Sequence, residues 1–394
     1  MNNNLKPAIR FKGFTEAWEQ RKAVDLAEYS KGNGYSKGDL TDVGTPIILY
    51  GRLYTKYQFA INEVDTFAVP RSGAVYSQGN EVIVPASGET AEDIARASAV
   101  EKSGVLLGGD LNVLRPFDFI NPLFLALAIS NGEPQNELAK KAQGKSVVHI
   151  HNSDIQEVTI AYPSRTEQDR IVSVFRNLGH LITLHQRKYD QLVNVKKAML
   201  EKMFPRDGKN VPEIRFAGFT EVWEQRKLEE YLSVSSDKNG DGTYDKTDVL
   251  SVSGDYGIVN QIEFQGRSFA GASVLNYGVV RTGDIVYTKS PLNSNPYGII
   301  KSNKGKTGIV STLYAIYHPK ENTHTYFVQT YFEQHARMNN YMHPLVNKGA
   351  KNDMKVSAEN ALKGQVCFPS YEEQKAISEY FSVIDNLITL HQEK

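Results

Sequence analysis

PAIRFKGFTEAWEQRK at residues 7–22 recurs as PEIRFAGFTEVWEQRK at residues 212–227, and this duplication decides the organisation of the 394-residue chain. Thirteen of its sixteen positions are identical, at an offset of 205. A second pair, YPSRTEQDRIVSVFRNLGHLITLHQRK at residues 162–188 and FPSYEEQKAISEYFSVIDNLITLHQEK at residues 368–394, matches at thirteen of 27 positions with an offset of 206. Self-similarity at a fixed spacing indicates a repeated architecture. The chain therefore contains two copies of one pair of repeated segments, which we call the frame: residues 7–22 with 162–188, and residues 212–227 with 368–394.

The segments enclosed by the two frames differ from each other. Residues 23–161 and 228–367 share one visible pattern, a buried-strand run in NEVIVPASG (residues 80–88) and in GDIVYTKSP (residues 283–291). Random sequence change after a duplication would alter the repeated segments and the enclosed segments equally. Because only the enclosed segments differ, the pattern favours two similar scaffolds with two different recognition tasks. Short β-rich runs alternate with Gly, Asn, Ser and Asp in both segments, which predicts two α+β domains with irregular sheets.

A long helix is predicted over residues 166–204. A proline and a serine precede it, Glu167 and Gln168 suit the free N–H groups of its first turn, and Pro205 stops it. At 1.5 Å per residue its length is ~58 Å, which is too long for its apolar face to be buried on one small domain. We expect residues 370–394 to supply a helical partner. The expected coiled-coil-like seam consists of Ile171, Val174, Leu178, Leu181, Leu192, Val195, Met199, Ile377, Phe381, Ile384 and Leu387.

Charge and composition exclude several classes of protein. Lys plus Arg and Asp plus Glu each number 45, and zero net charge argues against a protein that coats nucleic acid by bulk charge. The longest apolar run, PLFLALAI at residues 122–129, is far short of the ~20 residues of a spanning helix. The start, MNNNLKPAIR, lacks the apolar region of a secretory signal. The single cysteine, Cys367, fits a reducing compartment, so we expect a cytoplasmic protein.

The motif search predicts no catalytic residue, metal site or cofactor site in this chain. GKS at residues 144–146 lacks the earlier glycine of a phosphate-binding loop, and SNPY at residues 294–297 is one proline short of the N-P-P-Y of amino-methyltransferases. DKNGDGTYDKTD at residues 237–248 resembles a calcium loop, but its last acid is Asp248 where glutamate is usual, and a strand pattern follows. The two histidines of VVHIHNSD (residues 147–154) have no apparent third ligand.

Local lysine clusters carry the remaining chemistry. Residues 285–320 contain five lysines and no acid, and lysines surround Gly144 and Gly349 at matching places before the two long helices. Lys and Ser side chains contact phosphates, whereas Asn and Arg also read base edges. The candidate DNA-binding residues are Lys37, Arg52, Arg71, Ser72, Ser87, Lys140, Lys141, Lys145, Ser146, Lys289, Ser290, Asn293, Asn295, Lys301, Lys304, Lys306, Lys348, Lys351 and Asn352.

The chain resembles the DNA specificity subunits of type I restriction-modification systems. The resemblance covers essentially the whole chain and rests on the two P-x-x-x-E-Q helix starts, the two W-E-Q-R-K segments and VPASGETAEDIA at residues 84–95. It implies target-recognition domains at residues 1–163 and 207–369, each reading one half of an asymmetric bipartite DNA site. It also implies that helices at residues 164–206 and 370–394 pair antiparallel as a spacer.

The resemblance further implies a division of labour with partner subunits. Two modification subunits would bind S-adenosylmethionine and methylate adenine, and restriction subunits would use ATP and magnesium. This chain would then be a non-catalytic specificity scaffold that binds double-stranded DNA. Two alternatives stay open on the sequence alone: an enzyme with a fused nuclease or methyltransferase activity, and a coiled-coil adaptor that binds only protein.

Overall fold

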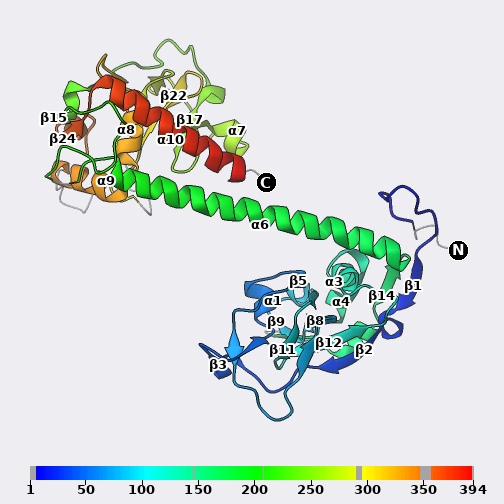
Figure 1. Cartoon of the computed structure of the whole chain (residues 1–394). Helices are drawn as coiled ribbons and strands as arrows, with labels where there is room; N and C mark the ends of the chain where they lie inside the picture. Colours follow the sequence, from blue (N-terminus) through cyan, green and yellow to red (C-terminus); the bar gives the residue numbers. More distant parts are fainter. Residues whose placement is uncertain (1–5, 145–146, 207, 290–294, 347–355, 393–394) are drawn as a thin grey trace. The chain divides into compact units, whose positions relative to one another are not determined.

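The computed structural model describes residues 6–144, 147–206, 208–289, 295–346 and 356–392. The chain divides into two compact units, Met1–Ile182 (unit 1) and Thr183–Lys394 (unit 2), and helices and sheets are mixed in both (Figure 1). The predicted α+β class is confirmed. Within the described ranges, no helix is both long and apolar enough to cross a membrane.

Unit 1 contains two five-stranded sheets. The first has the order β2-β12-β8-β10-β5 and the second the order β3-β6-β4-β11-β7. Every residue of the central strand β8 is buried, as expected for a strand covered on both faces. The strands are β2 (Ala27–Lys31), β3 (Leu40–Thr41), β4 (Thr45–Ile48), β5 (Ala60–Ile61), β6 (Phe67–Ala68), β7 (Tyr76–Gln78), β8 (Glu81–Pro85), β10 (Ser98–Val100), β11 (Ser103–Leu107) and β12 (Leu111–Pro116).

Helices pack against the first sheet of unit 1. Helix α3 begins after Asn121, whose side-chain oxygen accepts hydrogen bonds from the backbone N–H groups of Leu123 and Phe124. Pro122 occupies the first helical position, where no N–H is needed. A short pair of strands, β9 (Ser87–Gly88) and β13 (Val148–His149), completes this side. The helices are α1 (Arg52–Thr55), α2 (Ala91–Ile94), α3 (Pro122–Ile129), α4 (Gly132–Lys141) and α5 (Asn152–Gln156).

Unit 2 has a different sheet arrangement. One four-stranded sheet has the order β16-β23-β20-β21, and two separate strand pairs, β17-β18 and β19-β22, lie beside it. The strands are β16 (Leu232–Val234), β17 (Leu250–Ser253), β18 (Gly257–Asn260), β19 (Gly278–Val280), β20 (Ile285–Tyr287), β21 (Ile300–Ser302), β22 (Gly308–Val310) and β23 (Ala315–Pro319), and the helices are α7 (Gln261–Gln265), α8 (Thr325–Phe332) and α9 (His335–Met342).

The two repeats form the same strand pair in each unit. In unit 1, β1 (Glu19–Lys22) pairs antiparallel with β14 (Thr159–Tyr162). In unit 2, β15 (Glu224–Lys227) pairs antiparallel with β24 (Gln365–Phe368). In both pairs the EQRK segment of the first repeat lies against the strand that leads into the second repeat. The duplicated sequence thus forms the same antiparallel strand pair, β1–β14 in unit 1 and β15–β24 in unit 2, where the chain enters and leaves each set of sheets.

The two predicted long helices are present. Helix α6 (Arg165–Lys202) runs from unit 1 into unit 2, and α10 (Tyr371–Gln392) belongs to unit 2. Within unit 2, the last part of α6 runs antiparallel to α10, because His185 contacts His391 whereas Lys196, further along α6, contacts Asp385, earlier on α10 (Figure 1).

The predicted seam is corrected, because its residues do not form one buried stripe. Val174, Leu178, Leu181, Val195 and Leu387 are exposed. The other seam residues are covered chiefly by the units: Ile171 packs against the core of unit 1, Met199 against that of unit 2, and Leu192, Ile377, Phe381 and Ile384 are buried. The 3.6-residue period marks an apolar face but not what covers it, and the sheets and short helices of each unit supplied much of the cover.

Candidate DNA interface and its frame

An arginine–glutamate pair closes the frame in each unit. In unit 1, Arg10 Nε and Nη2 donate to Glu167 Oε1 and Oε2, at 2.7 Å each. In unit 2, Arg215 Nε and Nη2 donate to Glu373 Oε1 and Oε2 at the same distances. Both glutamates are only 1% exposed. A two-pronged arginine–carboxylate pair is strong and geometrically specific, so each pair fixes the start of a long helix against the first repeat.

The glutamine of each P-x-x-x-E-Q motif fastens the neighbouring loops. Gln168 Oε1 accepts from the N–H of Asn121 at 2.8 Å. Its amide nitrogen donates to the carbonyl oxygens of Phe119 and Pro163. Gln374 makes the equivalent three bonds in unit 2, accepting from the N–H of His324 and donating to the carbonyl oxygens of Asn322 and Pro369. The expectation that these first-turn side chains serve the helix N–H groups is therefore corrected, because they bind other segments.

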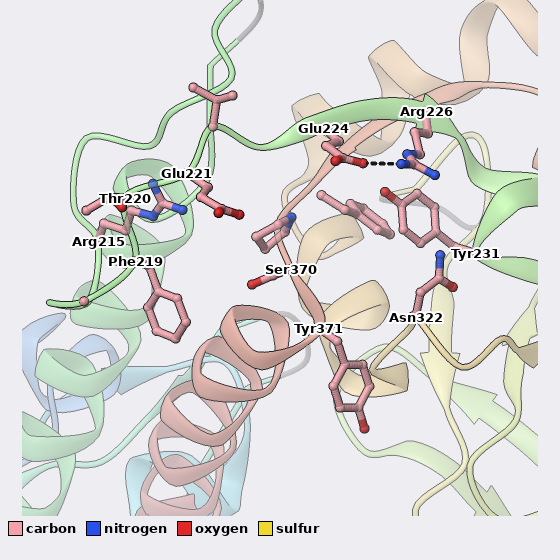
Figure 2. A pocket seen from close by; sticks show the side chains of 14 residues that line it. Arg215, Phe219, Thr220, Glu221, Glu224, Arg226, Tyr231, Asn322, Ser370 and Tyr371 are labelled. Atoms are coloured by element: carbon pink, nitrogen blue, oxygen red, sulfur yellow. Dashed lines mark ion pairs between the residues drawn. The ribbon is translucent and has the colours of Figure 1, made fainter.

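A pocket of about 420 Å³ lies beside the frame of unit 2 (Figure 2). It is lined by Arg215, Glu221 and Glu224 of the first repeat and by Ser370 and Tyr371 at the start of the second. Twelve of its fourteen lining residues lie in the repeated segments. The pocket is therefore built by the frame, which both units share, and is a poor candidate for reading different DNA sequences.

Three of the predicted DNA-binding residues have structural roles instead, and these predictions are corrected. Lys301 is buried and its ammonium lies 3.4 Å from Glu333 Oε1. The side chain of Arg52 is 8% exposed, pairs with Asp65 and also donates to a backbone carbonyl. Ser87 is buried, with its hydroxyl oxygen 3.1 Å from Nδ1 of His149. Burial and these partners leave such groups poorly placed for phosphates.

Four further candidates have partners within the chain. Lys141 pairs with Glu157, and Arg71 pairs with Asp39 while lying over the Tyr35 ring. Lys289 donates to the carbonyl oxygen of Thr312, and burial lowers its pKa. The ammonium of Lys304 lies 3.5 Å from the centre of the Tyr326 ring. These residues stay predictions as DNA contacts, although binding DNA would compete with the contacts they already make.

The remaining candidates stay predictions without further support. Lys37, Ser72, Lys140 and Lys306 are exposed and Asn295 is half-buried. Outside the described residues lie Lys145, Ser146, Ser290, Asn293, Lys348, Lys351 and Asn352.

The loop that resembles a calcium site uses its side chains to hold its own turn. The amide of Asn239 donates to the Tyr244 carbonyl and its oxygen accepts from the Tyr244 N–H. Asp241 accepts from Thr243, and Asp237 pairs with Arg281. In the described part of the chain, no group of three or more His, Cys, Asp or Glu side chains is arranged to hold a metal ion.

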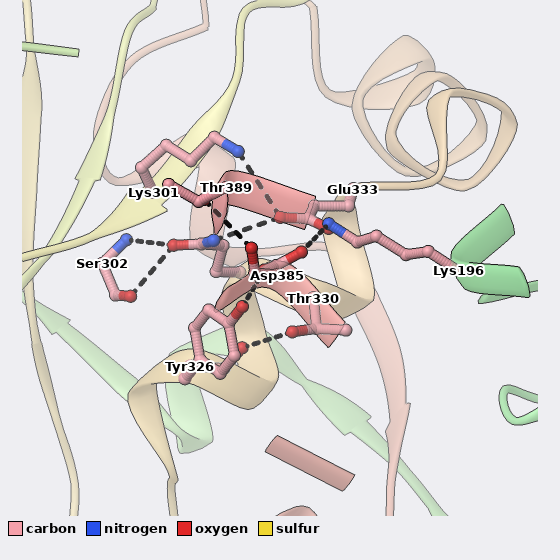
Figure 3. A network of polar contacts seen from close by, with 9 residues as sticks. Lys196, Lys301, Ser302, Tyr326, Thr330, Glu333, Asp385 and Thr389 are labelled. Atoms are coloured by element: carbon pink, nitrogen blue, oxygen red, sulfur yellow. Dashed lines mark hydrogen bonds and ion pairs between the residues drawn. The ribbon is translucent and has the colours of Figure 1, made fainter. Parts of the chain in front are cut away.

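Sequence reasoning missed a charged network in unit 2 (Figure 3). Lys196 of α6 lies between Glu333, at the end of α8, and Asp385 of α10. Burial alone would lower the pKa of Lys196, but the two carboxylates outweigh it and raise the pKa above 10.5. Burial would raise the pKa of Glu333, but Lys196 and Lys301 outweigh it and lower the pKa below 4.5. Residue spacing gave no signal for this network, because its three members come from separate parts of the chain.

Comparisons with known proteins find specificity subunits of type I restriction enzymes. Residues 15–194 match the family model described as the type I restriction modification DNA specificity domain. The putative type I restriction enzyme MjaX specificity subunit of Methanocaldococcus jannaschii is 23% identical over 313 residues, covering 74% of this chain and 68% of that protein. The type I restriction enzyme MjaVIII specificity subunit of the same organism is 22% identical over 334 residues, covering 80% and 74%.

The fold is also that of a solved relative. The crystal structure of the type I restriction-modification system S subunit from M. genitalium matches 100% of this chain and 93% of its own, with a TM-score of 0.59 and 13% identity. The structural likeness concerns the fold, and the sequence matches concern the family. Together they show that the chain is similar to type I specificity subunits, in sequence over residues 15–194 and more weakly over most of its length, and in fold.

Proposed function

We propose that this chain reads an asymmetric bipartite DNA site and directs partner subunits to it without catalysing a reaction itself. We assign one half-site to residues 1–163 (the first reader) and the other to residues 207–369 (the second reader). The observation that carries the proposal is the repeated frame, with its Arg10–Glu167 and Arg215–Glu373 pairs around unlike sheets. Two domains with the same repeated segments but different sheets are what two readers of different DNA sequences would require.

Helices α6 and α10 are the spacer in this proposal. The 38 residues of α6 give a length of ~57 Å. Two protein modules on one face of B-DNA lie about 34 Å apart, or a multiple of it, so a helix of this length is sufficient to separate two readers. The exposed lysines Lys37, Lys140 and Lys306 are candidates for phosphate contacts, which position a protein on DNA without reading its sequence.

Catalysis belongs to the partners in this proposal. Two modification subunits, carrying S-adenosylmethionine, would methylate adenine after flipping it out of the stack. Restriction subunits would use ATP and magnesium, and the assembly would act on DNA in the cytoplasm. The family matches support this division, because the curated relatives are named specificity subunits.

The test is to assay the full chain alone and with its modification subunits. We expect selective binding to a bipartite sequence, and methyl transfer from labelled S-adenosylmethionine only when the modification subunits are present. Methyl transfer or magnesium-dependent cleavage by the chain alone would overturn the non-catalytic assignment. Absence of sequence-selective DNA binding, with or without partners, would favour a protein-only adaptor.

A further inference from the structure

Lys196 joins three helices through one ammonium group. Its Nζ lies 2.6 Å from Glu333 Oε2 and 2.7 Å from Asp385 Oδ1. The three side chains are 20%, 13% and 25% exposed, respectively. Partial burial of an ion pair makes its geometry matter, since removal of one partner leaves an uncompensated charge. Helix α6 is therefore held to the ends of two other helices at one point.

The same network extends into the sheet of the second reader (Figure 3). Glu333 Oε1 accepts from the side-chain amide of Gln329 at 3.1 Å. Gln329 Oε1 accepts in turn from the backbone N–H and hydroxyl of Ser302 in β21. On the other side, Asp385 Oδ2 accepts from the hydroxyl of Tyr326 in α8. A continuous set of polar contacts thus runs from strand β21 to helix α6.

Lys196 lies near the point where α6 leaves the core of unit 2. One turn further along, Leu200 enters that core, followed by Met203 and Phe204. On the other side of Lys196, Val193 and Val195 are exposed, although Leu192 is buried and His185 contacts His391 of α10. Apolar contacts allow small rotations at little cost because they are not directional, whereas the two ammonium–carboxylate contacts of Lys196 are directional.

The first copy of the repeat has no counterpart of this arrangement. At an offset of 206, Asp385 corresponds to Gly179, which carries no charge. A side chain at Gly179 would meet the Phe59 ring, 3.1 Å from the position of a Cβ. Position 179 therefore supplies no carboxylate where Asp385 supplies one.

We infer that Lys196 is a positioning residue for spacing: its contacts fix the direction in which α6 leaves the second reader, and with it the half-site separation that the protein accepts. This inference rests on the proposed bipartite reading. From Lys196 back to Arg165, α6 extends ~46 Å. A tilt of ~5° at Lys196 would displace the start of the helix by ~4 Å over that length, which exceeds the ~3.4 Å rise of one base pair.

The test compares DNA targets that keep both half-sites and differ in the number of base pairs between them. Full chain with its modification subunits is measured as wild type, Lys196→Met, Lys196→Arg and Lys197→Met. Lys197 is the matched control, because it is exposed, adjacent on α6, and in no ion pair found among the described residues. The readout is the ratio of affinities for the preferred spacer and for spacers one base pair shorter or longer.

We expect Lys196→Met to reduce that ratio about tenfold, the size of one lost base contact, while the half-site bases stay the same. Lys196→Arg should restore the ratio, and Lys197→Met should leave it unchanged. A wild-type spacer ratio in folded Lys196→Met would overturn the inference. If that variant does not fold, the double variant Lys196→Met, Asp385→Asn is used, because Glu333 then keeps Lys301 as its partner. The spacer ratio of this double variant must also fall for the inference to stand. Failure of the proposed function would instead show as a wild-type protein without any bipartite preference.

Discussion

Nδ1 of His185 on α6 lies 2.9 Å from Nδ1 of His391 on α10. The two histidines occupy the same position of the duplicated LITLHQ segment, at an offset of 206. Two equivalent residues that contact each other on antiparallel helices lie at a local two-fold axis of that helix pair. This contact therefore fixes the register of α6 and α10 within unit 2, and one nitrogen must donate while the other accepts.

The register can be tested with a short bis-thiol cross-linker. We expect the pair His185→Cys and His391→Cys to be joined within one chain. The control pair Asn194→Cys and His391→Cys, whose first site is ~13 Å further along α6, should not be joined. Burial raises the pKa of the native Cys367, so that thiol should compete poorly. Peptide mass spectrometry measures the products, and equal yields for the two pairs would show that the register is wrong.

The arginine–glutamate pair of unit 2 should be important for its stability. Arg215→Met leaves Glu373 as a buried carboxylate without its partner, which should cost about 3–5 kcal/mol. The double variant Arg215→Met, Glu373→Gln should be more stable than Arg215→Met, because a neutral amide is less costly to bury than an unpaired charge. Denaturant unfolding measures both, with Arg10→Met as the counterpart in unit 1. Glu373→Gln alone completes the cycle. If the free-energy changes of Arg215→Met and Glu373→Gln add up to that of the double variant, the two side chains are not coupled and the pairing is contradicted.

The contact between Lys196 and Glu333 predicts a defined dependence of stability on pH. The pKa of Glu333 is lowered below 4.5, so its contribution is present above that pH and is lost as the pH falls through the folded value. The pKa of Lys196 is raised above 10.5, so its contribution is full below that pH and is lost as the pH rises through the folded value. The contact should therefore stabilise unit 2 between these limits.

Glu333→Gln should accordingly lower the free energy of unfolding of unit 2 by about 2–4 kcal/mol at neutral pH. The difference from wild type should shrink as the pH is lowered below 4.5, because the wild-type carboxyl also becomes neutral there. Unfolding titrations at a series of pH values measure this. A difference that is constant from neutral to acid pH would show that the charge of Glu333 has no role.

Phosphate contacts by the exposed lysines should appear in the salt dependence of DNA binding. Lys140→Gln and Lys306→Gln should each lower the slope of log affinity against log salt by about 1. Lys363→Gln, at an exposed lysine outside the predicted contacts, should leave the slope unchanged. Fluorescence anisotropy at several salt concentrations gives the slopes. An unchanged slope for Lys140→Gln would remove that lysine from the interface.

The sequence predicted the positions of the frame's helices well and the partners of its side chains less well. The repeats located both long helices within a few residues, because identity at a fixed offset marks elements that fold alike. The role of Glu167 and Gln168 was not predictable, since the residue types that suit a helix N-terminus are also those that pair across the fold. In the structure they bind Arg10 and loop backbone instead.

Side-chain surroundings account for the other differences. Leu178 and Phe381 have the same periodic spacing, yet the first is exposed and the second is buried in the core of unit 2. Lys301 lies in an acid-free stretch of sequence, but Glu333, 32 residues away, neutralises it in space. Spacing and local charge describe one element at a time, whereas burial and ion pairing depend on elements brought together by the fold.

The most direct test of the central claim is an exchange of the contents of one frame. Residues 228–364 would be replaced by the corresponding segment of a relative with a different target, leaving both repeats of the frame intact. The methylated sites of cells that contain the chimaera and the partner subunits would then be read by methylome sequencing. The account predicts that one half-site changes while the other half-site and the spacer stay the same; a change in both half-sites would contradict it.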